Sequence, residues 1–367
     1  MQDIKNKIIK EIQKNNGSIS IEKFTLMAMF DNESGYYISK KPIGKQGDFV
    51  TAPEISQLFG ELIGLYVFDY WNNYINKDFN LIELGPGNGT MMNDLVNINH
   101  NFPEYCSLLN IILIEKNKFL IKKQKKLLLK QTDKFKKISW LKEINKIKSQ
   151  FESVIIANEF FDCFPIRQFY KIDKKYFEKI VKYNKKNNIF YIDNIKKKLT
   201  KNLKKEIDHI YYKNKYKDGD IIEISLLKNK YLKDIGIYLK KNNGLLIIID
   251  YGNFESTGES TLQSVRKHKK TNFLLNPGKQ DITYMMDFSL IKNIFLKMKL
   301  NVYGPYFQGN FFKSLGIEIR KEKIIKNATN YQKIKINKSV QKIIDKKEMG
   351  NLFKVLILSS KKLKNYE

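Results

Sequence analysis

Cysteine and histidine are scarce in this chain of 367 residues, and their scarcity excludes several kinds of site. The two cysteines, Cys106 and Cys163, are too few for a disulfide framework or a cysteine-based zinc site. The three histidines, His100, His209 and His268, have no neighbouring ligand at a metal-binding spacing. We therefore expect a protein that holds no metal.

Long apolar runs are also missing. Leu245–Ile249 is among the longest and is far too short to span a bilayer. The N-terminal residues 1–16 alternate apolar and charged side chains and include Asp3 and Glu11, unlike a signal or transit peptide. These features predict no membrane span and a reducing, cytoplasmic location.

Arginine is nearly absent, although the chain is strongly basic. The formal net charge is +29, but only three of the 67 basic residues are arginines, namely Arg167, Arg266 and Arg320. Lysine runs such as Lys122–Lys126 and Lys196–Lys198 are typical of solvated helix faces. We interpret the charge as a compositional drift toward lysine, and we do not expect nucleic acid to be a partner.

What is present is an alternation of short apolar segments and helical patterns. Strands are predicted over residues 80–84, 111–114, 138–140, 154–157 and 245–249, with helical periodicity between them. This order predicts an α/β fold with a parallel sheet covered on both faces. Residues 353–358 predict a last, antiparallel edge strand, and the pattern between 166 and 218 predicts an insertion.

The most informative segment is a glycine-rich turn after the first predicted strand. The sequence Leu84-Gly85-Pro86-Gly87-Asn88-Gly89 leads directly into a predicted helix at residue 90. Glycines permit a tight turn and a close approach of a ligand to the backbone, and a helix N-terminus offers free N–H donors. A dinucleotide fingerprint would need glycine or alanine where Thr90 stands.

Two acids complete this pattern, which resembles motif I of class I methyltransferases. Glu83 precedes the turn by two residues, and Glu115 ends the second predicted strand. Glu83 would lie beside the cationic methionine part of S-adenosylmethionine, and Glu115 would accept hydrogen bonds from the ribose. Gly85, Pro86, Gly87 and Gly89 would form the turn around this cofactor. Glycine turns and strand-end acids also occur without a ligand.

A second polar loop, Asn158-Glu159-Phe160-Phe161-Asp162, follows the strand at 154–157. Sheet topology predicts that it lies beside the glycine turn, where methyltransferases hold the nucleophile. Carboxylates suit a nitrogen nucleophile, so Glu159 and Asp162 are the candidates for orienting it, with Asn158 added to the cofactor set. Alternatively, the two acids cap the following turn.

A third block, 47–57, contains Asp48, Glu54 and Gln57. Thr51 and Pro53 are explained by a helix start. Asp48 and Glu54 are the candidates for closing the site from the N-terminal side.

These blocks resemble the MidA-type methyltransferases, relatives of the mitochondrial complex I assembly methyltransferase. The resemblance rests on GDFVTAPEISQLFG at 47–60, ELGPGNGT at 83–90, NEFFDCFP at 158–165, IDYG at 249–252, TLQSVRKH at 261–268 and PGKQDITYMMDF at 277–288. The matches extend over roughly residues 18–358, but the lysine-rich insertion at about 170–217 does not match closely.

The resemblance implies a Rossmann-like class I methyltransferase with a mixed seven-stranded sheet. We expect an N-terminal helical cap (1–53), a methyltransferase domain (54–165 and 218–367) and an inserted subdomain (166–217). It also implies S-adenosylmethionine as cofactor and, as substrate, an arginine of a protein, the 49-kDa-type subunit of respiratory complex I or its bacterial counterpart. A small-molecule methyltransferase, a non-catalytic assembly chaperone and an RNA methyltransferase are the alternatives.

Overall fold

The structure is a computed structural model that describes residues 3–39, 51–148 and 150–364. Asp48 lies outside the described residues. The chain divides into two compact units, which we describe separately. The appended unit comprises Met1–Phe49, Asp162–Tyr231 and Phe254–Asp287, and the sheet unit comprises Val50–Phe161, Leu232–Asn253 and Phe288–Glu367. The N-terminal segment and the insertion thus belong to one unit, together with residues 162–165, 218–231 and 254–287, which the predicted division assigned to the methyltransferase domain.

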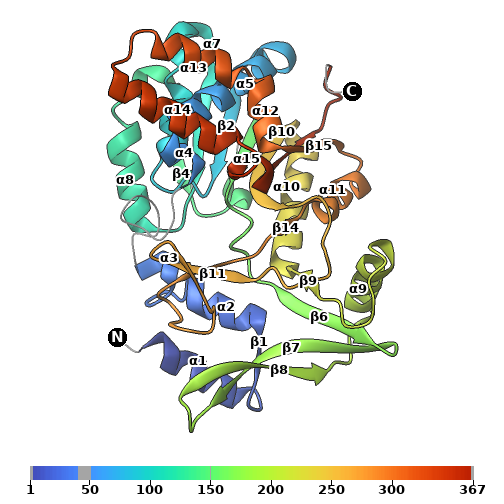
Figure 1. The fold of residues 1–367 in the computed structure, drawn as a ribbon. Helices are drawn as coiled ribbons and strands as arrows, with labels where there is room; N and C mark the ends of the chain where they lie inside the picture. The colour runs from blue at the N-terminus through green and yellow to red at the C-terminus, as the bar shows by residue number, and fades with distance from the viewer. Residues whose placement is uncertain (1–2, 40–50, 149, 365–367) are drawn as a thin grey trace. The chain divides into compact units, whose positions relative to one another are not determined.

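The sheet unit is built on a mixed sheet with the strand order β15-β16-β10-β5-β2-β3-β4 (Figure 1). The strands are β2 (Phe79–Leu84), β3 (Leu109–Ile114), β4 (Lys137–Leu141), β5 (Glu152–Asn158), β10 (Gly244–Asn253), β15 (Asn301–Phe307) and β16 (Phe353–Ser359). The five from β10 to β4 are parallel, and β16 is antiparallel to both of its neighbours. The predicted α/β fold is confirmed.

The strand order reverses between β2 and β5. From β2 the chain proceeds outward to β3 and β4, whereas β5 and β10 lie on the other side of β2. In open α/β sheets, ligands bind at the carboxyl ends of the strands beside such a reversal. The segments after β2, β3 and β5 are therefore where a ligand is expected.

The prediction of an edge strand at the end of the chain is wrong in one respect. β16 is antiparallel as expected, but β15 pairs with its other side and forms the edge. The segment that forms β15 contains Gly304 and Pro305, which indicate a turn in sequence. The register between the two strands shifts between Tyr303 and Tyr306, which accommodates these residues.

Helices surround this sheet, and their apolar faces pack against its strands. They are α4 (Ala52–Ile55), α5 (Gln57–Tyr74), α6 (Thr90–Val96), η1 (Asn99–Asn101), α7 (Pro103–Leu108), α8 (Lys118–Leu128), η2 (Thr132–Lys134), η3 (Ile144–Lys146), α11 (Phe288–Lys297), α12 (Gln308–Ser314), α13 (Ile317–Ile325), α14 (Asn330–Ile344) and α15 (Met349–Leu352). Phe59 of α5 stacks on Phe312 of α12 with ring centroids 4.6 Å apart, in one core with Leu81 and Val154. Burying each such side chain contributes about 1.5–3 kcal/mol.

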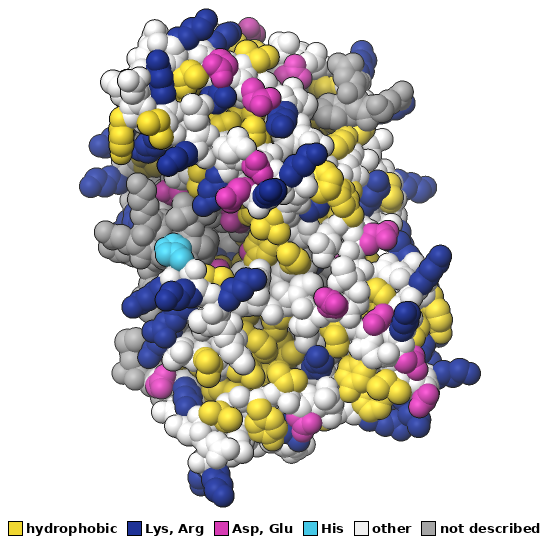
Figure 2. All heavy atoms as spheres, viewed as in Figure 1, with side chains coloured by type: hydrophobic (Ala, Val, Ile, Leu, Met, Phe, Trp, Pro, Cys, Tyr) yellow, Lys and Arg dark blue, Asp and Glu magenta, His cyan; other side chains and the backbone are white. Residues whose placement is uncertain are grey.

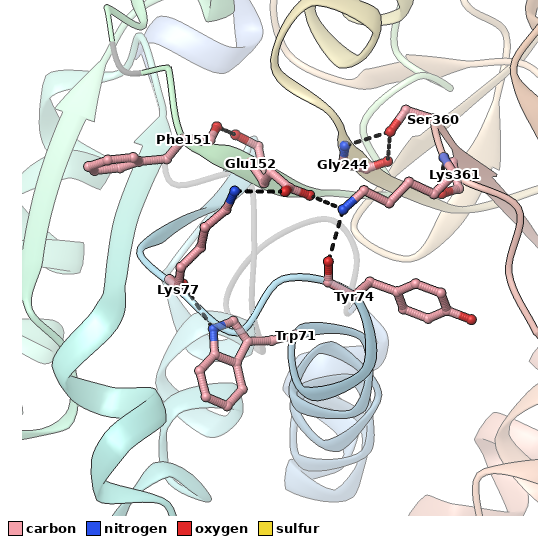
Figure 3. Close-up of polar contacts among 10 residues, drawn as sticks. Trp71, Tyr74, Lys77, Phe151, Glu152, Gly244, Ser360 and Lys361 are labelled. Atoms are coloured by element: carbon pink, nitrogen blue, oxygen red, sulfur yellow. Dashed lines mark hydrogen bonds and ion pairs between the residues drawn. The ribbon is translucent and has the colours of Figure 1, made fainter.

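At the amino end of the sheet, a buried carboxylate is fully paired. Glu152 begins β5 and is 9% exposed as a side chain, and it contacts Lys361 Nζ at 2.7 Å and Lys77 Nζ at 3.3 Å (Figure 3). Lys361 also donates to the carbonyl oxygen of Tyr74 at 2.8 Å, and Trp71 donates to that of Lys77 at 3.0 Å. The network joins β5, the end of α5 and the chain after β16.

The appended unit has its own sheets and core. One sheet has the order β1-β7-β6-β9 with β8 paired to β7, and a second has the order β12-β11-β13. The elements are α1 (Ile4–Lys14), β1 (Ile19–Ser20), α2 (Ile21–Phe30), α3 (Tyr36–Ser39), β6 (Arg167–Ile172), β7 (Lys175–Asn184), β8 (Ile189–Lys196), α9 (Lys201–Lys213), β9 (Ile222–Ile224), β11 (Gln263–Arg266), β12 (Lys269–Thr271), β13 (Asp281–Thr283) and β14 (Met286–Asp287). The helix α10 (Leu226–Asn242) begins in this unit, but from Leu232 on it belongs to the sheet unit. The expected N-terminal helices form α1 and α2.

The lysine runs lie on exposed surface, as the sequence indicates. In α8, Lys122, Lys125 and Lys126 are exposed, and so are Lys196 and Lys198. Figure 2 shows lysine and arginine side chains spread over the whole visible face, with acidic side chains between them. This distribution is that of solvated side chains.

Candidate functional site

The glycine turn follows β2 in the sheet unit and leads into α6. Gly85, Gly87 and Gly89 all have positive φ, at 63°, 53° and 83°. A Cβ at position 85 would lie 2.8 Å from the Phe160 ring, and one at position 89 would lie 3.2 Å from Gln124 Cγ. Only glycine takes this backbone without strain, so the sequence is fitted to a turn with little side-chain bulk.

Glu83 is a buried acid directly before this turn. It is 3% exposed, and its Oε2 has no hydrogen-bond partner among the described residues. Burial, and then the nearby Glu115, raises the pKa of the Glu83 carboxyl to about 8. An unpartnered buried carboxyl costs folding free energy, and a cationic ligand group would remove that cost.

Glu115 and Asn158 lie at the carboxyl ends of the two strands that flank β2. Glu115 follows β3 and accepts a hydrogen bond from the backbone N–H of Asn117 at 2.8 Å. Burial raises the pKa of its carboxyl above the ordinary range. Asn158 ends β5, is 9% exposed, and its Oδ1 has no hydrogen-bond partner among the described residues. With Glu83, these side chains form a row of polar groups across three adjacent strand ends.

Glu54 fastens the short helix α4 to the glycine turn. Its Oε1 accepts hydrogen bonds from Thr90 Oγ1 at 2.6 Å and from Asn88 Nδ2 at 3.1 Å. Lys123 of α8 donates to Asn88 Oδ1 at 3.0 Å. Glu54 therefore contacts the turn itself, and Thr51 and Pro53 begin α4 as expected.

Glu159, the first residue after β5, has an unusual backbone. Its φ is 48°, a left-handed value that is uncommon for a residue with a side chain. Its N–H donates to the Ile249 carbonyl oxygen at 2.9 Å, and its Oε1 accepts from the backbone N–H of Ala52 at 3.2 Å. Asn158 Nδ2 is 3.4 Å from the same oxygen. Strain of this kind concentrates at functional sites.

Asp162 belongs to the appended unit, where it is 7% exposed and its carbonyl oxygen accepts from the Tyr284 N–H at 3.3 Å. The structure thus brings Glu54, the glycine turn, Glu83, Glu115, Asn158 and Glu159 together in one unit. Pro86, within the turn, accepts the Gly89 N–H through its carbonyl oxygen at 2.7 Å. The functional roles of these residues and of Asp48 stay predictions.

Two buried polar residues beside this site were missed in the sequence. Asp250 of β10 is fully buried, and its carboxylate accepts from the backbone N–H groups of Phe161 at 3.1 Å and Tyr251 at 2.9 Å. Gln124 of α8 is also fully buried. The signal for Gln124 was a polar residue at four-residue spacing between the apolar Leu120 and Leu128.

Comparison with known proteins identifies the family. The model of a family of S-adenosyl-L-methionine-dependent methyltransferases matches residues 62–306. The chain belongs to this family. It is 30% identical to a Caenorhabditis elegans protein named protein arginine methyltransferase NDUFAF7 homolog, mitochondrial, over 84% of this chain and 75% of the relative. The Drosophila melanogaster homolog is 25% identical over 93% and 82%, and the human protein of the same name is 25% identical over 94% and 81%.

The fold agrees with that of a solved structure from Burkholderia thailandensis that was crystallised with S-adenosyl-homocysteine. The TM-score is 0.81 with 21% identity, over 97% of this chain and 91% of that one. A native crystal structure of a protein from the same organism gives a TM-score of 0.80 with 22% identity, over the same shares of the two chains. The predicted class I methyltransferase fold is confirmed.

The residues at the strand ends fit S-adenosylmethionine, the cofactor of this family. The buried Glu83 carboxyl, whose Oε2 has no hydrogen-bond partner among the described residues, would suit the cationic methionine part, and Glu115 would suit the ribose hydroxyls. The three left-handed glycines add no side-chain bulk to the turn, so a ligand can approach its backbone closely. When bound, the cofactor supplies the methyl group as an activated sulfonium.

The predicted cytoplasmic location is wrong, because the curated relatives are named as mitochondrial proteins. Within the described ranges, no three acidic, histidine or cysteine side chains are grouped as a metal would require. No helix in the described part of the chain combines the length and apolarity needed to cross a membrane.

Proposed function

We propose that this methyltransferase modifies an arginine side chain of a protein, and that the protein is the 49-kDa-type subunit of respiratory complex I or its bacterial counterpart. Two sources support the proposal. Relatives that align with most of the chain are named protein arginine methyltransferases and mitochondrial. The complex I subunit comes from the family resemblance of the sequence blocks at 47–60 and 158–165.

The observation that carries the choice of a nitrogen acceptor is Glu159. Methyl transfer breaks the carbon–sulfur bond, whose electron pair stays on sulfur and leaves a neutral thioether, while the lone pair of the attacking nitrogen forms the carbon–nitrogen bond. The nitrogen must lie in line with the carbon–sulfur bond, and the proton that it loses passes to the carboxylate beside it or to water. A guanidinium is cationic, so a carboxylate beside it both orients it and compensates its charge.

Glu159 suits that role because its carboxylate is half-buried and fixed at the end of β5. Its Oε1 already accepts the Ala52 N–H, and its backbone is held by the bond from its own N–H to Ile249. Asp162, three residues later, is proposed as the second acid of the same loop. Glu83 and Glu115 would hold the cofactor.

The test is methyl transfer from S-adenosylmethionine with a tritiated methyl group to the purified 49-kDa-type subunit. We expect label in the protein and methylarginine in its hydrolysate, and no label when the modified arginine is replaced by lysine. The Glu159→Gln variant should keep its cofactor affinity and lose about 100-fold in kcat, since a neutral amide can still accept from Ala52. Label confined to small molecules would instead identify a small-molecule methyltransferase. Cofactor binding without transfer to any substrate would indicate an assembly chaperone.

A further inference from the structure

The buried side chain of Gln124 contacts three residues at the carboxyl end of the sheet, namely Gly87, Glu115 and Trp140. Its Nε2 donates to the carbonyl oxygen of Gly87 at 2.8 Å and lies 3.5 Å from Glu115 Oε2. Its Oε1 accepts from Trp140 Nε1 at 3.0 Å. One side chain on α8 thus contacts the turn after β2, the acid after β3 and the ring on β4.

The tryptophan fixes which way the amide faces. An indole N–H can only donate, so the Gln124 oxygen must point to Trp140 and its NH₂ group must point to Gly87 and Glu115. A carbonyl and a carboxylate can only accept, so this orientation satisfies all three partners. The reversed amide would set like groups against each other at every contact.

The two acceptors of the Gln124 amide, the Gly87 carbonyl oxygen and the Glu115 carboxylate, differ in how many other contacts hold them in place. Gly87 has φ of 53° and carries no side chain that packs, so its carbonyl gains its orientation from this hydrogen bond. Glu115, in contrast, also accepts a hydrogen bond from the backbone N–H of Asn117. Gln124 is fully buried, so no water replaces the amide if it is lost.

We propose that Gln124 is a positioning residue that sets cofactor affinity, because its hydrogen bonds fix the position of the Gly87 carbonyl group relative to the Glu115 carboxylate. It does not touch the reacting atoms. Its loss should therefore weaken cofactor binding and leave kcat at saturating cofactor nearly unchanged.

The test compares Gln124→Met, which keeps the length and packing of the side chain and removes its hydrogen bonds, with Leu128→Ala. Leu128 is fully buried on the same helix and is one turn away from Gln124. Titration calorimetry gives the Kd of S-adenosylmethionine and S-adenosyl-homocysteine, thermal unfolding gives the midpoint, and turnover with the proposed substrate, the 49-kDa-type subunit, gives kcat.

We expect Gln124→Met to raise both Kd values about tenfold, as when buried polar groups lose a partner, with kcat within twofold. Leu128→Ala should lower the unfolding midpoint and leave Kd within twofold. Trp140→Phe, which removes the donor that orients the amide together with part of the ring, should raise Kd about threefold. Wild-type affinity in Gln124→Met, or an equal loss of affinity in Leu128→Ala, would overturn the proposal. If the wild type itself failed to bind either ligand, the cofactor site would be refuted and not merely the role of Gln124.

Discussion

The parallel sheet has a buried carboxyl group near each end of its strands, and the two groups differ in their polar partners. At the amino end, Glu152 has two lysine partners and joins three parts of the chain (Figure 3). At the carboxyl end, Glu83 is also buried, but its Oε2 has no partner among the described residues. The strands β2 and β5 lie side by side, so the same sheet contains both arrangements.

The difference separates stability from function. A buried carboxyl with partners costs little, whereas one without partners costs folding free energy or takes up a proton. The raised pKa of Glu83, about 8, expresses that cost. A sheet that pairs Glu152 so well has no structural reason to keep Glu83, and a cationic ligand group supplies that reason.

The largest expected effect on cofactor affinity comes from a substitution in the glycine turn, at the carboxyl end of β2. In Gly85→Val, a β-branched side chain would have to adopt φ of 63° and its Cβ would meet Phe160 at 2.8 Å. We expect the Kd of S-adenosylmethionine to rise more than 100-fold, because the turn cannot keep its backbone conformation with a valine at this position. Titration calorimetry measures this, and circular dichroism serves as the control for folding. Near-normal binding would show that the turn does not form the cofactor site.

A second prediction uses the pKa of Glu83 to sharpen the comparison. The folded-state pKa, about 8, lies above the ordinary value of 4.5, so the ligand-free protein holds a proton on Glu83 at pH 6 to 7.5. A cationic ligand group favours the carboxylate, so binding releases that proton and affinity should rise with pH, by up to about tenfold per unit. Calorimetry at several pH values, in buffers with different ionisation enthalpies, measures affinity and proton release.

Glu83→Gln is the matched variant for that measurement, because it keeps the shape and removes the titration. It should bind about tenfold more weakly at pH 7.5 and show a flat pH profile. The same linkage has a sign for stability. A raised pKa means that the ligand-free protein loses stability as pH rises from about 4.5 through about 8, and Glu83→Gln should not show that part of the loss. A wild-type profile in the variant would assign the titration to another group.

Most strands of the large sheet could be predicted from the sequence, but one of them could not. β2, β3, β5 and β10 are buried on both faces, so they are continuous apolar runs in the sequence, and their predicted positions agree with the structure within a few residues. β15 was missed because its Gly304-Pro305 pair indicates a turn. The acids at strand ends could be found because each follows an apolar run directly.

The individual hydrogen bonds between distant segments could not be predicted. The link from Glu54 to Thr90 joins residues 36 positions apart, and the one from Gln124 to Gly87 joins residues 37 apart. Neither depends on a local pattern, because each requires the packing of a whole helix against the turn. The membership of 254–287 in the appended unit is of the same kind, since its partners lie far away in the sequence.

The smallest expected effect comes from breaking the amino end. Glu152→Gln removes the charge that Lys361 and Lys77 contact, and these lysine side chains are 33% and 64% exposed, so water can solvate them. We expect a loss of about 1 kcal/mol, which corresponds to a fall of about 2–4 °C in the unfolding midpoint. Lys77→Met, which removes the more exposed partner, should cost less. In both variants the Kd of S-adenosylmethionine should stay within twofold of the wild type, because Glu152 lies at the far end of β5 from Asn158. If Glu152→Gln lowers stability without changing affinity, whereas Glu83→Gln lowers affinity, the amino end of the sheet contributes to stability and the carboxyl end to cofactor binding. Weaker cofactor binding in Glu152→Gln would mean that a change at the amino end is transmitted through the sheet to the cofactor site.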